Sequence, residues 1–283
     1  MYPAPIPETA RLRRALYAFG VFAILILWLA PLFAVALTSL RSGEDVAGGN
    51  LWGWPTSFGL AENYLGVFTQ TPMARYFVNS LLITVPTVLA VLVLSTLTGF
   101  VLSKYRFRGR TVLFAIFIGG NFLPAQIMMI PVRDLMVQLG LYDTVFALMI
   151  FHTAFQTGFA TLFMRNFIAA LPHELFEAAR AEGASPAQVL RLVVVPLVRP
   201  ALAALAILIF TFVWNDYFWA IVLTLSDTVK PVTAGLANLR GQYVSAWNII
   251  SAATIIVAVP PVTMFFLMQR HFIAGLTMGA VKG

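Results

Sequence analysis

Long apolar runs separated by short polar segments are the main feature of this chain. Six of them reach the roughly 20 residues that a helix needs to cross about 30 Å of hydrocarbon at 1.5 Å per residue. They cover residues 15–40, 78–103, 111–132, 144–167, 201–225 and 249–268. The pattern predicts an all-α polytopic membrane protein with six transmembrane helices, kinked in or near the spans at Pro31, Pro124, Pro260 and Pro261.

The composition favours the same fold class. Of the 283 residues, 60% are hydrophobic and 10% are charged, and the mean hydropathy is +0.88, which does not suit the surface of a soluble protein. Six spans and their connections use up this length, so we expect one membrane domain over residues 1–283. The first run is too long for a signal-peptide core and ends in no small-residue cleavage pattern, so we expect it to be retained.

The basic residues predict the orientation of the chain. A net charge of +7 could indicate nucleic-acid binding in a soluble protein, but in a membrane protein Lys and Arg report topology. One set of alternate connections holds thirteen of them: Arg11, Arg13, Arg14, Lys104, Arg106, Arg108, Arg110, Arg165, Arg180, Arg191, Arg199, Arg270 and Lys282. The other set holds only five: Arg41, Arg75, Arg133, Lys230 and Arg240. Because the cytoplasmic side collects positive charge, both termini are expected inside, with no nucleic-acid partner.

Two further observations concern the connections. Residues 41–77, on the outer side, hold 37 residues with aromatic side chains among glycines, so they can form short interfacial helices but no independent core. The first three spans differ from the last three in polar content and loop length. The lack of an internal repeat weighs against a secondary transporter built from inverted repeats.

The longest inner connection, residues 171–200, predicts two short helices joined at a glycine. Pro172 suits a first helical turn, and a helix is expected from there to Glu182, where Gly183 ends it in the left-handed conformation. Ser185, Pro186 and Gln188 supply the N-cap, first-turn proline and capping-box acceptor of a second helix, which gives way to the fifth span at Pro196. Such an elbow either docks on a partner through small alanines or lies on the membrane as an amphipathic hairpin.

This connection carries a resemblance to a known family. The EAA loop of ABC importer permeases has the same pattern, here Glu177-Ala178-Ala179, Gly183 and Val193-x-Val195-Pro196, in its usual place before the penultimate span. Glu182 stands where Asp is usual, and Val195 where Leu is usual. Matches extend over nearly the whole chain: Asn63-Tyr64, Asn79-Ser80, Leu123-Pro124, Ile130-Pro131, Gly140-Leu141, Trp214-Asn215-Asp216 and the ending QRHFIAGLTMGAVKG. The chain resembles the maltose-type second permease, the MalG-like half of the carbohydrate uptake family.

The resemblance implies a type I ABC importer permease in the bacterial plasma (inner) membrane. Its first span, residues 15–40, would be peripheral, and residues 78–270 would form the transport core with a coupling loop at 169–196. The implied partners are a MalF-like second permease, two cytoplasmic ATP-binding subunits, an extracytoplasmic solute-binding protein, a sugar-like substrate and membrane lipid. The residues implied in ATPase coupling are Glu177, Ala178, Ala179, Gly183, Ala184 and Ser185. Residues 275–283 match the tail that can reach between the ATPases.

The chain has no phosphate-binding Gly-x-x-x-x-Gly-Lys-Ser/Thr sequence, so ATP and Mg are expected to be used by the partner subunit. Without cysteine it has no disulfide or Fe–S ligation, and its histidines lack carboxylates at metal-ligand spacing. We therefore expect no bound cofactor, no metal, no catalytic residue and no enzyme activity. A membrane-embedded enzyme would need a catalytic cluster that the sequence does not show.

Polar residues within the apolar runs are candidates for the translocation path. Asp216 is the only carboxylate well inside a run, and Asn215 and Trp219 lie beside it; this mix suits a hydroxyl-rich ring or a structural contact between helices. His152 and Gln156 share one helical face, expected to look inward with Gln126 or to be structural. The rival to an ABC permease is an ion-gradient transporter with Asp216 as its coupling site.

Overall fold

The computed structural model describes residues 10–49, 53–242 and 246–280, and this part of the chain is helical, with one isolated antiparallel bridge between Arg41 and Phe58. Four of its helices are long and apolar enough to cross a membrane. These are α1 (Arg11–Leu40), α4 (Met73–Lys104), α7 (Val145–Ala169) and α14 (Trp247–Ala280). The predicted all-α class is confirmed.

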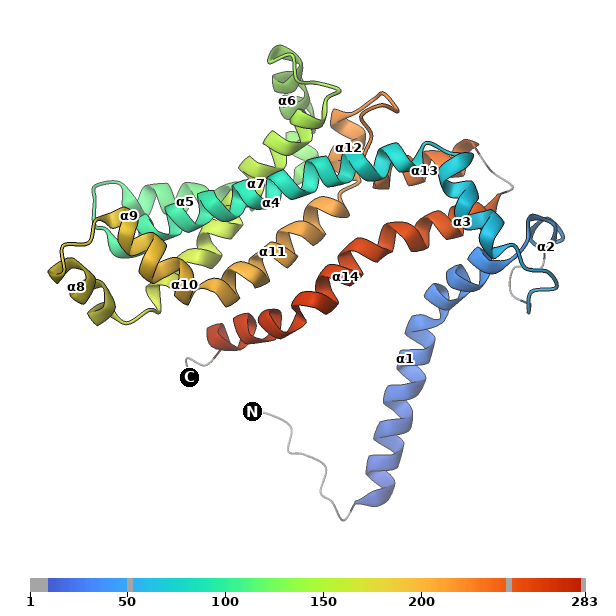
Figure 1. Ribbon diagram of the computed structural model, residues 1–283, viewed down its shortest axis with the longest axis horizontal. Coiled ribbons are helices and arrows are strands. Elements are labelled where there is room, and N and C mark those ends of the chain that lie inside the picture. Colours follow the sequence, from blue (N-terminus) through green and yellow to red (C-terminus); the bar gives the residue numbers. More distant parts are fainter. Residues whose placement is uncertain (1–9, 50–52, 243–245, 281–283) are drawn as a thin grey trace. The chain divides into compact units, whose positions relative to one another are not determined.

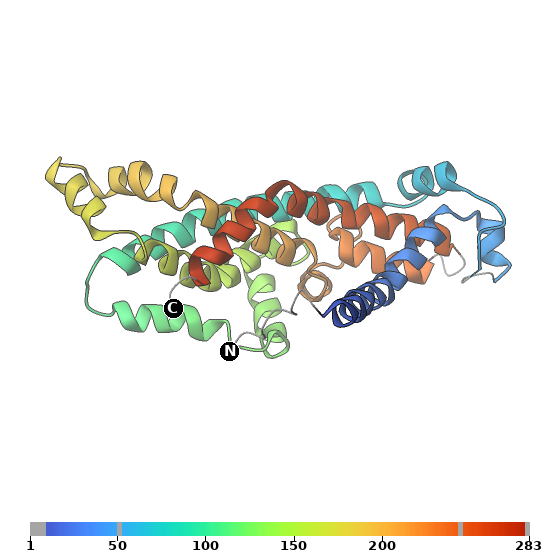
Figure 2. The ribbon, with the colours of Figure 1, turned by 90° about the horizontal axis from the view of Figure 1, so that it is seen from below.

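Two bent helix pairs raise the number of candidate spans in the described residues to six. The first pair, α5 (Arg110–Gly120) and α6 (Ala125–Gln138), meets at 101°, and α6 leaves α5 sharply in Figure 2. In the second pair, the short helices of residues 186–197 meet α11 (Arg199–Trp214) at 77°. The sequence predicted a kink at Pro124 in the third run, 111–132, and the helix breaks there. The fifth run, 201–225, was expected to be one helix, and that expectation is wrong because α11 ends within it at Trp214.

Local chemistry explains both breaks. Pro124 has no N–H to donate and restricts the residue before it, so the helix stops and restarts around residues 121–124. In the fifth run, α11 ends at Trp214 and α12 (Phe218–Leu223) begins after three intervening residues. The carboxylate of Asp216 accepts hydrogen bonds from the backbone N–H groups of Trp219 and Ala220, at 3.3 and 3.1 Å, and so caps the new helix.

The chain divides into two compact units, Met1–Gln70 with Leu239–Ile255, and Thr71–Asn238 with Ile256–Gly283. In the first unit, α2 (Gly43–Ala47) and α3 (Leu60–Thr69) are the short helices expected in the outer connection. Asn63 of α3 donates hydrogen bonds to the carbonyls of Ser39 and Arg41, at 2.9 and 2.7 Å, and accepts one from Asn248 at 2.7 Å. One buried amide thus joins the end of α1 to the start of α14.

The core of the second unit is formed by α4, α7 and α11, which pack side by side (Figure 1). The helices α4 and α7 touch closely at Gly99, where an added Cβ would lie 2.9 Å from the backbone nitrogen of Arg165. Next to this point the hydroxyls of Thr98 and Thr161 are hydrogen-bonded at 2.7 Å. Small and hydroxylated side chains therefore hold this pair, as is usual between helices in lipid.

Polar side chains at the other end of α4 hold the connection that leads into α13 (Val232–Gln242). Asn79 donates to the carbonyls of Thr228 and Lys230, both at 3.0 Å, and the hydroxyl of Ser80 accepts from the N–H of Val232 at 2.8 Å. The pair Asn79-Ser80 thus fixes the connection between α12 and α13 to α4.

A tryptophan satisfies a carbonyl that a proline in α14 leaves without a hydrogen-bond donor. Pro261 has no N–H, so the carbonyl four residues before it, that of Val257, loses its helical donor. The indole N–H of the buried Trp214 donates to this carbonyl at 3.1 Å. The freed backbone group is therefore satisfied from α11, as the apolar surroundings require.

Candidate coupling elbow and polar cluster

The elbow consists of α8 (His173–Ala181), α9 (Pro186–Gln188), a π-helical turn η1 (Val189–Val194) and α10 (Val195–Leu197). It begins at His173 rather than at Pro172. In Figure 1, α8 and α9 lie at one end of the second unit. The two-helix elbow that the sequence predicted is confirmed.

Gly183 ends α8 in the predicted left-handed conformation, with φ of +79°. Its N–H donates to the carbonyl of Arg180, and the N–H of Ala184 donates to the carbonyl of Ala179, both at 3.0 Å. These two bonds, spanning three and five residues, form a Schellman motif. The direction of the chain after α8 is thus fixed by two backbone bonds and one glycine.

The predicted capping box opens the next helix. The N–H of Gln188 donates to the Ser185 hydroxyl at 3.3 Å, and the Gln188 side chain accepts from the N–H of Ser185 at 2.7 Å. The π-helical turn that follows was not predicted. It stands before Pro196 and Pro200, two residues that cannot donate backbone hydrogen bonds, where the chain bends toward α11.

The elbow is anchored to the helical bundle through Phe176. This side chain is only 2% exposed, and α8 packs against η1. The ammonium group of Lys104, the last residue of α4, lies 3.9 Å from the centre of the Phe176 ring and donates to the carbonyl of Leu171 at 3.3 Å. Lys104 therefore ties the start of the elbow to the end of α4.

The opposite side of the elbow is open. Glu177 has a side chain that is 67% exposed and lies 3.2 Å from the imidazole of His173. The other residues implied in coupling are exposed or half-buried: Ala178, Ala179, Gly183, Ala184 and Ser185. A carboxylate beside small side chains on a rigid turn forms a surface that a partner can approach closely.

Three of the six candidate path residues meet in the second unit. The Nε2 atom of His152 lies 3.4 Å from a carboxylate oxygen of Asp216, and both side chains are largely buried. The ring of Trp219 lies 3.9 Å from the ring of Phe151, the residue that precedes His152. The side chain of Thr233 donates to the Asp216 carbonyl at 2.5 Å. The pairing of His152 with Asp216 joins α7 to the break before α12, and no sequence spacing indicated it.

The other three path candidates are not part of this cluster. Gln156 lies one turn from His152 on α7 and is half-buried, whereas Asn215 and Gln126 are exposed. No hydrogen bond among the described residues links any of them to the cluster. The expectation that Gln126 shares an inward surface with His152 receives no support from these contacts.

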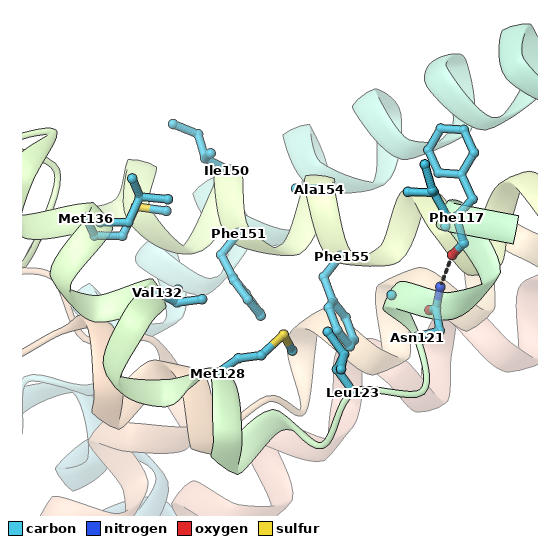
Figure 3. A pocket seen from close by; sticks show the side chains of 14 residues that line it. Phe117, Asn121, Leu123, Met128, Val132, Met136, Ile150, Phe151, Ala154 and Phe155 are labelled. Carbon is cyan, nitrogen blue, oxygen red and sulfur yellow. Dashed lines mark hydrogen bonds between the residues drawn. The ribbon is translucent and has the colours of Figure 1, made fainter. Parts of the chain in front are cut away.

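An apolar cavity of about 370 Å³ lies between α5, α6 and α7 (Figure 3). Phe117, Met128, Val132, Phe151 and Phe155 line it, and the Asn121 side chain is turned to the carbonyl of Phe117, at 2.7 Å. The sharp bend between α5 and α6 opens this space. Its apolar lining suits lipid or a packed side chain better than a free sugar.

The helical bundle, its broken spans and the capped elbow are the architecture of a permease, a membrane component that gives solutes a path across the membrane and does not catalyse a reaction. The chain belongs to the family of binding-protein-dependent transport system inner membrane components, whose model matches residues 92–277. It is the membrane-spanning permease subunit of an ABC importer and lies in the inner membrane as a multi-pass protein, and ATP hydrolysis belongs to a separate subunit of such importers. The ion-gradient alternative is left without support.

The chain is similar along almost its full length to named permeases. It is 34% identical to the osmoprotective compounds uptake permease protein GgtD of Synechocystis sp., covering 93% of this chain and 90% of GgtD. It is 32% identical to the arabinooligosaccharides transport system permease protein AraQ of Halalkalibacterium halodurans, covering 98% of this chain and 99% of AraQ. Among solved structures, a chain of a bacterial ABC transporter for import of the acidic polysaccharide alginate matches with a TM-score of 0.83 and 26% identity, over 95% of this chain and 100% of that chain.

Proposed function

We propose that this permease imports sugars or related polyhydroxylated solutes as half of a heterodimeric, alternating-access pore, with a MalF-like permease as its other half. Relatives named for arabinooligosaccharides and for osmoprotective compounds support this substrate class. The aromatic and polar cluster of His152, Asp216 and Trp219 suits a hydroxyl-rich ring, which offers both an apolar face and hydrogen-bonding groups.

The observation that carries the coupling proposal is the geometry of the elbow. Its open side presents Glu177 and Ala178, while Phe176 on the inner side is buried and lies against the ammonium group of Lys104. An ATP-binding subunit docked on the open side would therefore push on α4 when its dimer closes. Rigid-body movement of α4 and α7 would then convert ATP-driven closure into alternating access.

The test is the amount of ATP-binding subunit that copurifies with Glu177→Ala in mild detergent. If Glu177 forms a charge pair across the interface, its loss costs about 2 to 5 kcal/mol when the pair is buried. Glu174→Ala is the matched control, because Glu174 is also an exposed glutamate on α8. Loss of the ATP-binding subunit in the first variant only supports docking; equal retention in both would leave the elbow as a hairpin lying on the membrane.

Both termini are proposed to be cytoplasmic, which places the elbow on the side where ATP is available. Reporters fused after Arg106 and at the C-terminus are expected to report the cytoplasm, and one near Gly49 the outside. A cytoplasmic signal from the Gly49 fusion contradicts the orientation and the placement of the elbow. The substrate is tested separately, by identifying the copurified solute-binding protein and screening it against sugars and polyols.

A further inference from the structure

The short helix α12 is held at both ends by the start of α7. At its first turn, the carboxylate of Asp216 caps the helix and lies 3.4 Å from Nε2 of His152. Trp219, in the same turn, packs against Phe151 with 3.9 Å between the ring centres. Both of these partners belong to α7, so the first turn of α12 and the polar cluster of His152, Asp216 and Trp219 are attached to that helix.

Asp143, two residues before the first residue of α7, holds the other end of α12. Its backbone N–H donates to the carbonyl of Leu223, the last residue of α12, at 3.0 Å. One oxygen of its carboxylate accepts the N–H groups of Leu225 and Ser226, at 2.7 and 2.9 Å, and the other oxygen accepts the hydroxyl of Ser226. The backbone and both carboxylate oxygens of one residue therefore fix the carboxyl end of α12.

The backbone of Asp143 is in an unfavourable conformation. Its φ is +59°, and among the described residues it is the only non-glycine residue with a positive φ. Such conformations persist only where the surrounding contacts hold them, and they are concentrated at functional sites. The next residue, Thr144, caps α7 by accepting the N–H of Ala147 at 3.3 Å. Asp143 thus joins the fixed start of α7 to the end of α12.

The connection of α12 to α11 is looser than its attachment to α7. Residues 215–217 separate the two helices, and Asn215 and Tyr217 are exposed. The helix α12 packs against α6 and α7. Because it has only six residues, its own backbone hydrogen bonds contribute little to its stability. Its position therefore depends on the contacts at its two ends.

We propose that Asp143 is a positioning residue for transport, which acts through α12 and keeps Trp219 and Asp216 against α7. Without its carboxylate, two backbone N–H groups lose their acceptor and the end of α12 is released from α7. Since α12 is only about 9 Å long at 1.5 Å per residue, this release also displaces its first turn, where Trp219 lies. The effect on uptake rests on the proposed function, in which the polar cluster meets the solute.

Hydrogen exchange followed by mass spectrometry, on the complete importer complex, tests the attachment. Asp143→Gly removes the carboxylate and suits the positive φ, so the backbone conformation is kept. Asp143→Asn keeps an oxygen that can accept both N–H groups, and asparagine also tolerates this conformation. Exchange over residues 218–226 should be about tenfold faster in Asp143→Gly, as expected for the loss of a hydrogen bond to a charged group, and nearly unchanged in Asp143→Asn. Unchanged exchange in Asp143→Gly overturns the proposal.

The number of solute molecules imported per ATP hydrolysed, in proteoliposomes, tests the role in transport. The probe is the radiolabelled sugar or polyol that the solute-binding protein binds in the screen described above. Asp143→Gly should lower this ratio severalfold, and Asp143→Asn should restore it. Asp227→Gly is the matched control, because Asp227 is a carboxylate of the connection after α12 that pairs with Lys230 and not with α7; its ratio should be normal. If uptake and ATP hydrolysis fall in proportion in Asp143→Gly, the residue supports only the amount of folded complex and the proposal is wrong.

Trp219→Ala separates the positioning role from the proposed path. If Asp143 acts through Trp219, adding Asp143→Gly to Trp219→Ala should lower the ratio no further, whereas additive losses overturn the proposal. If Trp219→Ala lowers the ratio and Asp143→Gly does not, the positioning role alone is wrong. If Trp219→Ala leaves the ratio unchanged, the path assigned under the proposed function is wrong and the positioning role falls with it, while faster exchange in Asp143→Gly would still establish the attachment of α12.

Discussion

Replacing Gly183 by alanine tests the elbow at its most constrained point. The backbone there has φ of +79°, and an added Cβ would meet no atom within 4 Å. The cost therefore comes from the backbone alone, about 1 to 2 kcal/mol for a non-glycine residue in the left-handed region. This corresponds to a shift of roughly 5- to 30-fold away from the elbow conformation. Gly183→Val should cost more, because β-branched residues avoid this region.

The assay is the ratio of copurified ATP-binding subunit to permease, together with substrate-stimulated ATP hydrolysis in the reconstituted complex. Gly140→Ala is the matched control: Gly140 has φ of +68°, open space around its Cα, and the same two-bond helix ending after α6. Both variants should reach the membrane in normal amounts. Coupling should fall in Gly183→Ala, further in Gly183→Val, and remain in Gly140→Ala. Unchanged coupling in both Gly183 variants would refute the argument that this turn positions the docking surface.

Three further predictions concern single contacts. Trp214→Phe keeps the aromatic packing but leaves the carbonyl of Val257 unsatisfied, so thermal unfolding in detergent should show a loss of about 1 to 3 kcal/mol. Asp216→Asn should retain most of the uptake rate, because a neutral sugar carried by an ATP-driven importer needs no titrating carboxylate and the amide oxygen can still accept one of the two N–H bonds that cap α12. Abolished uptake in a proton-dependent assay would contradict this. Burial tends to raise the pKa of Asp143, but hydrogen bonds from Ser226 and Leu225 lower it below the usual 3.8. The contribution of Asp143 to stability is therefore present above pH 3.8 and is lost as the pH falls through the lower folded pKa. Stability measured from pH 7 to pH 3 should show less acid dependence in Asp143→Asn.

The elbow was predictable because residues close together in the sequence determine its structure. Gly183, Ser185 and Gln188 act within a few residues of their own positions, so their spacing alone indicates the turn and the capping box. The existence of the spans was predictable for a similar reason, since each is a long uninterrupted apolar run. The π-helical turn was missed because no residue type marks it.

The polar cluster could not be predicted because its contacts join distant parts of the chain. His152 and Asp216 are separated by 64 residues, and only the packing of α7 beside α12 brings them within 3.4 Å. The break before α12 was missed because hydropathy does not distinguish a buried carboxylate that lines a path from one that starts a helix. Asp143 likewise gave no indication that it accepts the N–H groups of Leu225 and Ser226, 82 and 83 residues away.

The bond between Trp214 and the carbonyl of Val257 links two positions that must change together over evolution. Alanine at position 261 would restore a backbone donor that competes with the indole for the same carbonyl, whereas loss of the indole would leave that carbonyl empty in an apolar environment. Either change alone disturbs the pairing of this carbonyl, and both together return it to the backbone N–H of residue 261. Among homologues, tryptophan at the first position and proline at the second should therefore be gained and lost as a pair.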